Sequence, residues 1–181
     1  MKTKITPEGD ALAAAHGTNT IASDLVQTLI NNYRSNQMNL VNKGLGITDS
    51  NSIWFDLPKL KNFIAAMEDE IKSSNPDVSD EDMGIRFYYA AYPKAEEWDI
   101  MADHPVEKEY AERHTLVMIP TMKKADENGE MLDYDFNPLN EISGKSMALF
   151  SKSKGGTFPD ITFAENHGTL APPSDPKVQS F

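Results

Sequence analysis

Apolar side chains recur every three or four residues in two stretches of the chain, and this spacing predicts two amphipathic helices. The first helix is expected over about residues 20–36. Ser23 and Asp24 suit its N-terminus, because their side-chain oxygens can accept hydrogen bonds from free backbone amides. Its apolar stripe consists of Ile21, Leu25, Val26, Leu29, Ile30 and Tyr33. The next segment, NLVNKGLGITDSNS, contains two glycines and several Asn, Ser and Asp residues, and we expect a loop there.

The second helix has the clearest boundaries in the chain. A short β-prone run, Ile53–Phe55, precedes it. Asp56 can cap the helix, and Pro58 falls in the first turn, where a missing amide costs little. Asn75–Pro76 ends it, because the residue before a proline disfavours helical backbone. Its expected apolar face consists of Leu57, Leu60, Phe63, Ile64, Met67 and Ile71.

Strands are predicted where apolar residues recur at every second position. Residues 84–92 alternate Ile85, Phe87 and Tyr89 with Arg86, Tyr88 and Ala90. We expect the set with Phe87 and Tyr89 to pack on the helices, and Arg86 with Tyr88 to form an exposed patch suited to a partner. A helical turn or two is expected around 106–112. Residues 114–124 form an apolar run suited to a central strand, until Pro120 interrupts it.

The pair Asn128–Gly129 is the strongest hairpin signal in the chain. On the return strand, Leu132, Tyr134 and Phe136 alternate with Asp133 and Asp135, which predicts one solvated, acidic face. The two aspartates could act as an acid–base pair, although a solvated face explains them as well. Residues 146–150, SMALF, suit either a helix or a strand.

The order of these elements predicts an α+β fold, with a mostly antiparallel sheet, helices packed on one face and an extended C-terminal arm. We expect a flexible segment over 1–18, a single α+β domain over 19–150 and the arm over 151–181. Within the arm, 157–173 should pack on its own domain or on a neighbouring subunit. Its apolar anchors are Phe158, Ile161, Phe163 and Leu170, with Gly168 allowing a turn and Pro172 and Pro173 restricting the backbone.

Composition narrows the functional classes. The 181-residue chain has 17 Lys and Arg against 28 Asp and Glu, a formal net charge of −11, which disfavours nucleic acid and anionic membranes as partners. It has no cysteine, which excludes disulfides, thiolate nucleophiles and sulfur-ligated metals. The N-terminus lacks the apolar run of a signal peptide, and no run of eighteen apolar residues occurs. We therefore expect a soluble, cytoplasmic protein.

Three local patterns fail as cofactor or metal motifs. The four histidines are scattered without a ligand spacing such as HExxH. Around Asp126–Gly129 the glycine comes too early for an EF-hand calcium loop. Ser143–Ser146 resembles the end of a phosphate-binding loop, but Leu139 stands where its first glycine is needed. We expect no cofactor and no metal.

The leading interpretation is therefore an interaction or assembly protein without catalytic activity, whose partner is another protein or a second copy of itself. The alternative is a small-ligand-binding or hydrolase-like protein, with Arg86, Tyr88, His114 and His167 as binding residues. That alternative requires the four residues to converge in one concave pocket with shifted protonation, whereas an interaction protein needs a flat apolar patch. A third hypothesis is an acidic decoy that binds the basic site of an enzyme.

The segments IWFDLPKLKNFI, GIRFYYAAYP, HTLVMIPT and NHGTLAPP together resemble a family of short uncharacterised bacterial proteins. Its members share a WFxLxxLKxFI-like helix opener, a GIRFY strand, a TLVxxP strand and a C-terminal NxGxLxPP segment. The resemblance covers roughly residues 53–173 and implies a shared fold, with no assigned reaction. Members often carry a cysteine beside the double proline. Here Ala171 and Ser174 flank it, so no thiol role carries over.

Overall fold

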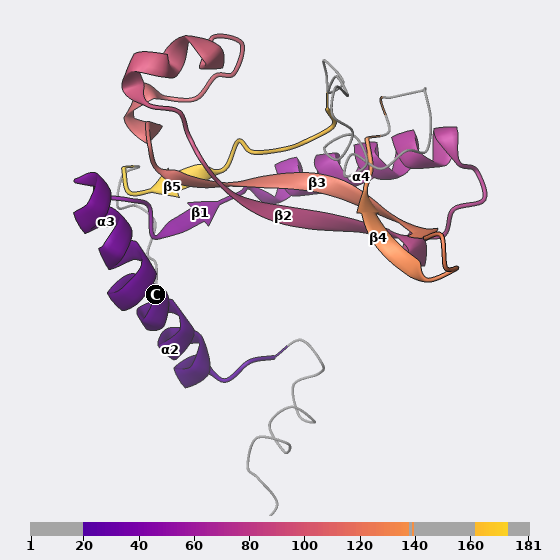
Figure 1. The fold of residues 1–181 in the computed structure, drawn as a ribbon, viewed down its shortest axis with the longest axis horizontal. Coiled ribbons are helices and arrows are strands. Elements are labelled where there is room, and N and C mark those ends of the chain that lie inside the picture. The colour runs from indigo at the N-terminus through magenta and orange to yellow at the C-terminus, as the bar shows by residue number, and fades with distance from the viewer. Residues whose placement is uncertain (1–19, 138, 140–161, 174–181) are drawn as a thin grey trace, which may run out of the picture.

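The computed structural model describes residues 20–137, 139 and 162–173, which form an α+β fold with two antiparallel sheets. The larger sheet has the strand order β2 (Met83–Ala91), β3 (His114–Ala125) and β4 (Met131–Asp135). The smaller sheet pairs β1 (Ser52–Trp54) with β5 (Thr169–Ala171). Figure 1 shows helix α4 running along the larger sheet, whereas α2 and α3 project from the end where β1 and β5 lie. The predicted fold class is confirmed.

Helix α4 (Leu57–Ser74) begins and ends where its sequence predicts. The Asp56 carboxylate accepts a hydrogen bond from the Lys59 amide at 2.7 Å, Pro58 lies in the first turn, and Asn75 follows the last turn. The buried row is narrower than expected. It consists of Phe63, Met67 and Ile71, four residues apart, while Leu57 and Ile64 are exposed. The sheet covers only one row of the helix, so Leu57 and Ile64 remain in solvent and Leu60 is only partly buried.

The main core lies between α4 and the larger sheet. Met67 and Ile71 pack with Phe136, which directly follows β4. Side chains from β2, β3, the loop after α4 and the C-terminal segment complete the cluster, namely Met83, Ile85, Met122, Val78 and Phe163. The ring of Phe163 also stacks on Phe63 of α4, with 5.3 Å between the ring centroids. The predicted C-terminal arm therefore contributes directly to the core.

Strand β3 is central, but Pro120 does not interrupt it. Pro120 pairs with Ile85 of β2, and its carbonyl oxygen accepts a hydrogen bond from the Phe136 amide at 2.8 Å. The nitrogen of Pro120, which has no hydrogen, lies on the side of β3 that faces β4 and the C-terminal segment. On that side the pairing with β4 begins at Thr121, and Met118 bridges to Glu165. A proline is tolerated there because no ladder hydrogen bond needs its amide.

The β3–β4 hairpin forms as the Asn–Gly pair predicts. Gly129 has a φ of 82°, and the Asp126 carboxylate accepts hydrogen bonds from the amides of Asn128 and Glu130 at 2.8 and 2.9 Å. The expected acidic face of β4 is only partly solvated, because Asp135 is buried. It binds Arg86 and Tyr88 across the sheet, and this pairing makes a buried carboxylate tolerable.

The segment 162–173 packs on its own chain. Glu165 and Met118 exchange two backbone hydrogen bonds at 2.9 and 3.1 Å, and β5 then pairs with β1 in the register Ile53 to Leu170. Leu170 is fully buried in a second core cluster with Tyr92 and Tyr110. Two 3₁₀ helices, Ala95–Met101 and Lys108–Tyr110, form this end of the molecule and include the turn expected around 106–112.

The expected loop after the first helix is partly helix. Helix α2 (Ser23–Tyr33) continues through a π-helical turn, Arg34–Met38, into α3 (Asn39–Leu45). Asn36 and Asn39 do not break it, because their side-chain amides donate to the carbonyl oxygens four residues earlier. The helix ends at Gly46, whose φ is 71°. The SMALF segment and the expected boundaries at 18/19 and 150/151 lie outside the described residues.

Candidate functional site

Arg86 and Tyr88 come together, as their alternation on β2 predicts. Both side chains bind the carboxylate of Asp135, and Arg86 Nη2 donates to the carbonyl oxygen of Asp133 at 2.9 Å. The hydrogen bond to Asp135, reinforced by burial, raises the pKa of Tyr88. The carboxylate already neutralises the guanidinium, so this cluster ties β2 to β4 and leaves little free positive charge for an anionic ligand.

His114 lies elsewhere and is held by a residue that the sequence analysis did not single out. The side chain of Asp49 is fully buried, and its Oδ1 accepts hydrogen bonds from the amides of Ser50 and His114, each at 2.8 Å. Its Oδ2 binds His114 Nδ1. Asn42 Oδ1 accepts from the Asp49 amide at 2.8 Å, which links the group to α3. A carboxylate with these donors fixes the ring of His114 in one orientation.

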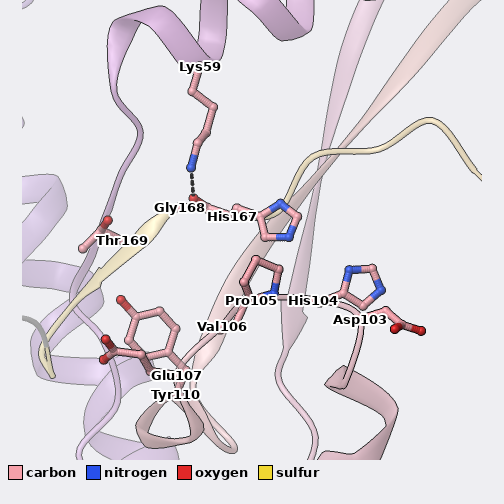
Figure 2. Close-up of a pocket in the computed structure, with 10 residues that line it drawn as sticks. All are labelled: Lys59, Asp103, His104, Pro105, Val106, Glu107, Tyr110, His167, Gly168 and Thr169. Carbon is pink, nitrogen blue, oxygen red and sulfur yellow. Dashed lines mark hydrogen bonds between the residues drawn. The ribbon is translucent and has the colours of Figure 1, made fainter.

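His167 belongs to a third place, on the C-terminal segment. Glu165 Oε1 accepts from the His167 amide at 2.6 Å and contacts His167 Nδ1 at 3.0 Å. Lys59 Nζ donates to the His167 carbonyl oxygen at 2.7 Å, as the dashed line in Figure 2 shows. Glu165 therefore orients His167. The two contacts fix both the ring and the backbone of this turn.

A cavity of about 500 Å³ lies beside His167 (Figure 2). The rings of His104 and His167 lie side by side along it, with 6.1 Å between their centroids. His167 Nε2 is buried, and no described residue hydrogen-bonds to it. Lys59 lines the same cavity as Asp103 and Glu107, so its charges are mixed in sign. Within the described ranges, no group of three or more His, Asp or Glu side chains could hold a metal ion.

The four sequence-derived candidates therefore occupy three separate places, at Asp135, Asp49 and Glu165. The ligand-binding alternative requires all four residues to line one pocket. They do not, because each is hydrogen-bonded to a carboxylate in a different part of the fold. Whether any of them binds a ligand stays a prediction. Asp49 could not have been found from the sequence, since it lies in a polar loop 65 positions before His114 and only the fold brings them together.

Exposed apolar side chains cover two parts of the described structure, the helical segment Ser23–Leu45 and one face of β2. From Ser23 to Leu45 no residue is buried, and Leu25, Leu29 and Leu40 are 50%, 56% and 73% exposed. On β2, the face carrying Phe87 and Tyr89 is also exposed, and Tyr89 reaches 90%. The expectation that this set packs on the helices was wrong beyond Ile85, because α4 covers only the start of β2.

Comparison of the chain with protein-family models, with curated proteins and with solved structures gives no match. The resemblance to uncharacterised bacterial proteins stays a prediction. Among the helices of the described ranges, none has both the length and the apolar character needed to cross a membrane.

Proposed function

We propose that the protein is an assembly module that associates with a second copy of itself through the continuous helix Ser23–Leu45, here called the N-terminal helix. The observation that carries this proposal is an amphipathic helix with no buried residue and with leucines at least half exposed. Exposed apolar side chains that recur along one helix need a covering surface, and an identical helix offers one of the same length and character.

The charge of this helix favours a second copy. Between Ile21 and Leu45 the only charged residues are Asp24, Arg34 and Lys43, whereas the whole chain carries a net charge of −11. Interface centres are depleted of charged residues. This helix is therefore a surface on which two acidic copies can meet without strong repulsion. The same net charge repels nucleic acid and anionic membranes, so we propose neither as a partner.

The positions of the charges suggest an antiparallel pair. Asp24 lies nine residues before Tyr33, and Lys43 lies nine residues after Arg34. A two-fold axis near Tyr33 and Arg34 would place Asp24 of each copy opposite Lys43 of the other. The exposed residues around that axis, Asn32, Ser35 and Asn36, are uncharged. An isologous contact of this kind is self-complementary and stops at the dimer.

The interface would be small. A helix of this length spans about 35 Å, and one helix pair buries less than the roughly 1,200 Å² at which stable complexes begin. We expect a dissociation constant in the range of about 1–100 μM, with Phe87 and Tyr89 available to enlarge the contact. The absence of cysteine fits the cytoplasmic location that we propose for it.

Sedimentation equilibrium of the full chain across this concentration range tests the proposal. A double variant, Leu25→Gln with Leu29→Gln, keeps good helix formers and should remain monomeric. Ile100→Gln is the matched control, because Ile100 is at least as exposed but lies on a 3₁₀ helix away from the N-terminal helix. A full chain that stays monomeric, or a Leu25/Leu29 variant that associates normally, would contradict the proposal.

A charge exchange tests the antiparallel arrangement. Asp24→Lys or Lys43→Asp alone should weaken association, and the two together should restore it. The effect on the helix itself runs the other way, because each change places an unfavourable charge at a helix end and the double variant has both. Restored association in the double variant therefore reports pairing between copies, whereas the weakest association in that variant would exclude the antiparallel arrangement.

A further inference from the structure

The region around His114 contains a second cavity, of about 220 Å³. It lies between α2, the loop before β1 and the neighbouring ends of β2 and β3. Its apolar wall comes from Tyr33, Ile53, Tyr89 and Leu116, and its polar wall includes Asn51 and His114. Pockets for drug-sized ligands measure roughly 300–1,000 Å³, so this one suits a smaller molecule.

Asp49 determines which hydrogen-bonding role His114 has in this cavity. The Asp49 carboxylate receives two backbone N–H groups as well as His114 Nδ1. A carboxylate is an acceptor, so Nδ1 carries a proton, and in the tautomer that this selects Nε2 presents a lone pair. No described residue donates a hydrogen bond to Nε2 in this structure. His114 therefore offers an acceptor to whatever occupies the cavity.

A second acceptor in the wall is also without a donor. Asn51 Oδ1 is buried and has no hydrogen-bond partner among the described residues. Its backbone is fixed, because the Asn51 amide donates to the Ala171 carbonyl oxygen at 2.9 Å. Buried polar atoms are rarely left without partners, so this oxygen, on a residue that lines the cavity, would gain from a donor that enters beside it.

We propose that this cavity binds a compact, neutral aromatic molecule that carries a hydroxyl group. The hydroxyl donates to His114 Nε2 or Asn51 Oδ1, and the ring packs between Tyr33 and Tyr89. Among the described residues that line the cavity, His114 is the only ionisable side chain besides the tyrosines, so a charged ligand would lose its hydration without a counter-charge. The two tyrosine rings in the lining favour a flat aromatic body over an aliphatic one.

The proposal is for binding and not for hydrolysis. Ser50, the serine next to Asp49, donates its hydroxyl to the Pro172 carbonyl oxygen at 2.7 Å. The Ser50 hydroxyl is therefore hydrogen-bonded to the C-terminal segment and not to His114, which would have to activate it as a nucleophile. The site does not use the exposed leucines, although it shares Tyr33 and Tyr89 with the surface proposed for self-association. The Leu25→Gln, Leu29→Gln variant, which should remain monomeric, therefore separates ligand binding from self-association.

Phenol, anisole and benzene are the probes for the test. The three share one ring, but only phenol donates a hydrogen bond. Titration of the full chain is followed by ¹⁵N NMR of the histidine side chains, at probe concentrations that leave the far-UV circular dichroism unchanged. We expect phenol to shift the His114 Nε2 resonance and to bind about tenfold more tightly than anisole or benzene, the effect of one hydrogen bond.

Two variants separate this site from a merely structural role of His114. Leu116→Trp should fill the cavity and abolish phenol binding, while His104→Gln, at the other cavity, should leave it unchanged. In Asp49→Asn the side-chain amide can donate to Nδ1, which moves the ring proton to Nε2. The preference for phenol should then shrink, because Nε2 has become a donor and the oxygens of phenol and anisole can both accept from it.

Equal binding of the three probes to the unmodified chain, or no binding by phenol, would overturn the proposal. Phenol binding that survives Leu116→Trp would place the ligand elsewhere and would also overturn it. These outcomes do not depend on whether Asp49→Asn folds.

Discussion

Helix α4 and the N-terminal helix have similar apolar periodicity, yet they differ in what covers it. Phe63, Met67 and Ile71 of α4 are buried against the larger sheet. Leu25 and Leu29 repeat the same four-residue spacing but are at least half exposed. An apolar stripe therefore shows that a helix has a face to cover, and the fold decides whether the same chain covers it.

The largest expected effect comes from shortening matched residues in the two helices. Ile71→Ala removes a fully buried side chain and should lower the free energy of unfolding by about 2–5 kcal/mol, through lost burial and the cavity left behind. Leu29→Ala should change the free energy of unfolding of the monomer by less than about 0.5 kcal/mol. Urea denaturation at a protein concentration below self-association measures both.

Equal losses in these two variants would show that the N-terminal helix is covered within its own chain. The comparison between the helices would then fail, and the proposed dimer would lose its basis. A loss for Leu29→Ala that appears only at high protein concentration would instead support a second copy as the cover, because binding stabilises by mass action.

The C-terminal segment packs in the core, and a substitution at Gly168 tests how tightly it packs against β1. A Cβ at this position would lie 2.4 Å from Ile53 Cγ2 and 2.7 Å from Phe55 Cζ. Gly168→Ala should therefore destabilise by about 1–3 kcal/mol and speed hydrogen exchange in β5. Thr169→Ala is the control, since it removes atoms from the same strand without adding any. Unchanged exchange in Gly168→Ala would mean that the segment is not held against β1.

Alkaline pH should act on the covered part through Tyr92. Burial, the largest cause, raises the pKa of Tyr92, which packs beside Tyr110 and donates to the Asn166 carbonyl oxygen at 3.2 Å. An unfolded tyrosine loses its proton near pH 10, while folded Tyr92 keeps it. Stability should therefore fall above about pH 10, by up to about 1.4 kcal/mol per pH unit until the folded pKa is reached.

Denaturation at several pH values between about 9 and 11, on either side of the unfolded tyrosine pKa, would measure that slope, and Tyr92→Phe should reduce it. The exposed Tyr89 supplies the control, since Tyr89→Phe should leave the slope as it is. A slope unchanged by Tyr92→Phe would mean that the buried hydroxyl does not contribute to the alkaline loss of stability.

Local rules predicted the covered part of the fold well. The Asp56 cap, the Pro58 first turn and the Asn128–Gly129 hairpin all act between residues that are close in sequence, so the sequence alone determines them. The face of α4 was predicted too wide, because periodicity marks every apolar position but does not reveal how much of it a sheet can cover.

The remaining features depend on partners far apart in the chain. Asp135 was expected in solvent and is buried because Arg86 and Tyr88 reach it from β2. Pro120 fits inside β3 because its nitrogen lies between the pairing with the segment around Glu165 and the pairing with β4, where no amide hydrogen is needed. The pairing of His114 with Asp49 likewise spans 65 positions. No periodicity or motif encodes such pairs, which explains why the candidate residues were named but the carboxylates that hold them in separate places were not.

The smallest expected effect concerns two glycines near the end of the N-terminal helix. Gly44 lies inside α3, and no atom lies within 4 Å of the position that a Cβ would take there, so Gly44→Ala should stabilise the helix by about 0.5–1 kcal/mol. Since α3 has no buried residue, this gain should appear as hydrogen exchange that is about 2- to 5-fold slower over Asn39–Leu45, without a shift in the urea midpoint.

Gly46→Ala should act in the opposite direction, although its surroundings are equally open. Gly46 has a φ of 71°, a backbone region in which a Cβ costs roughly 1–2 kcal/mol, so exchange in α3 should become faster. If both substitutions moved the global urea midpoint, the N-terminal helix would unfold together with the α4 core. The two regions would then be one cooperative unit, despite the difference in their burial.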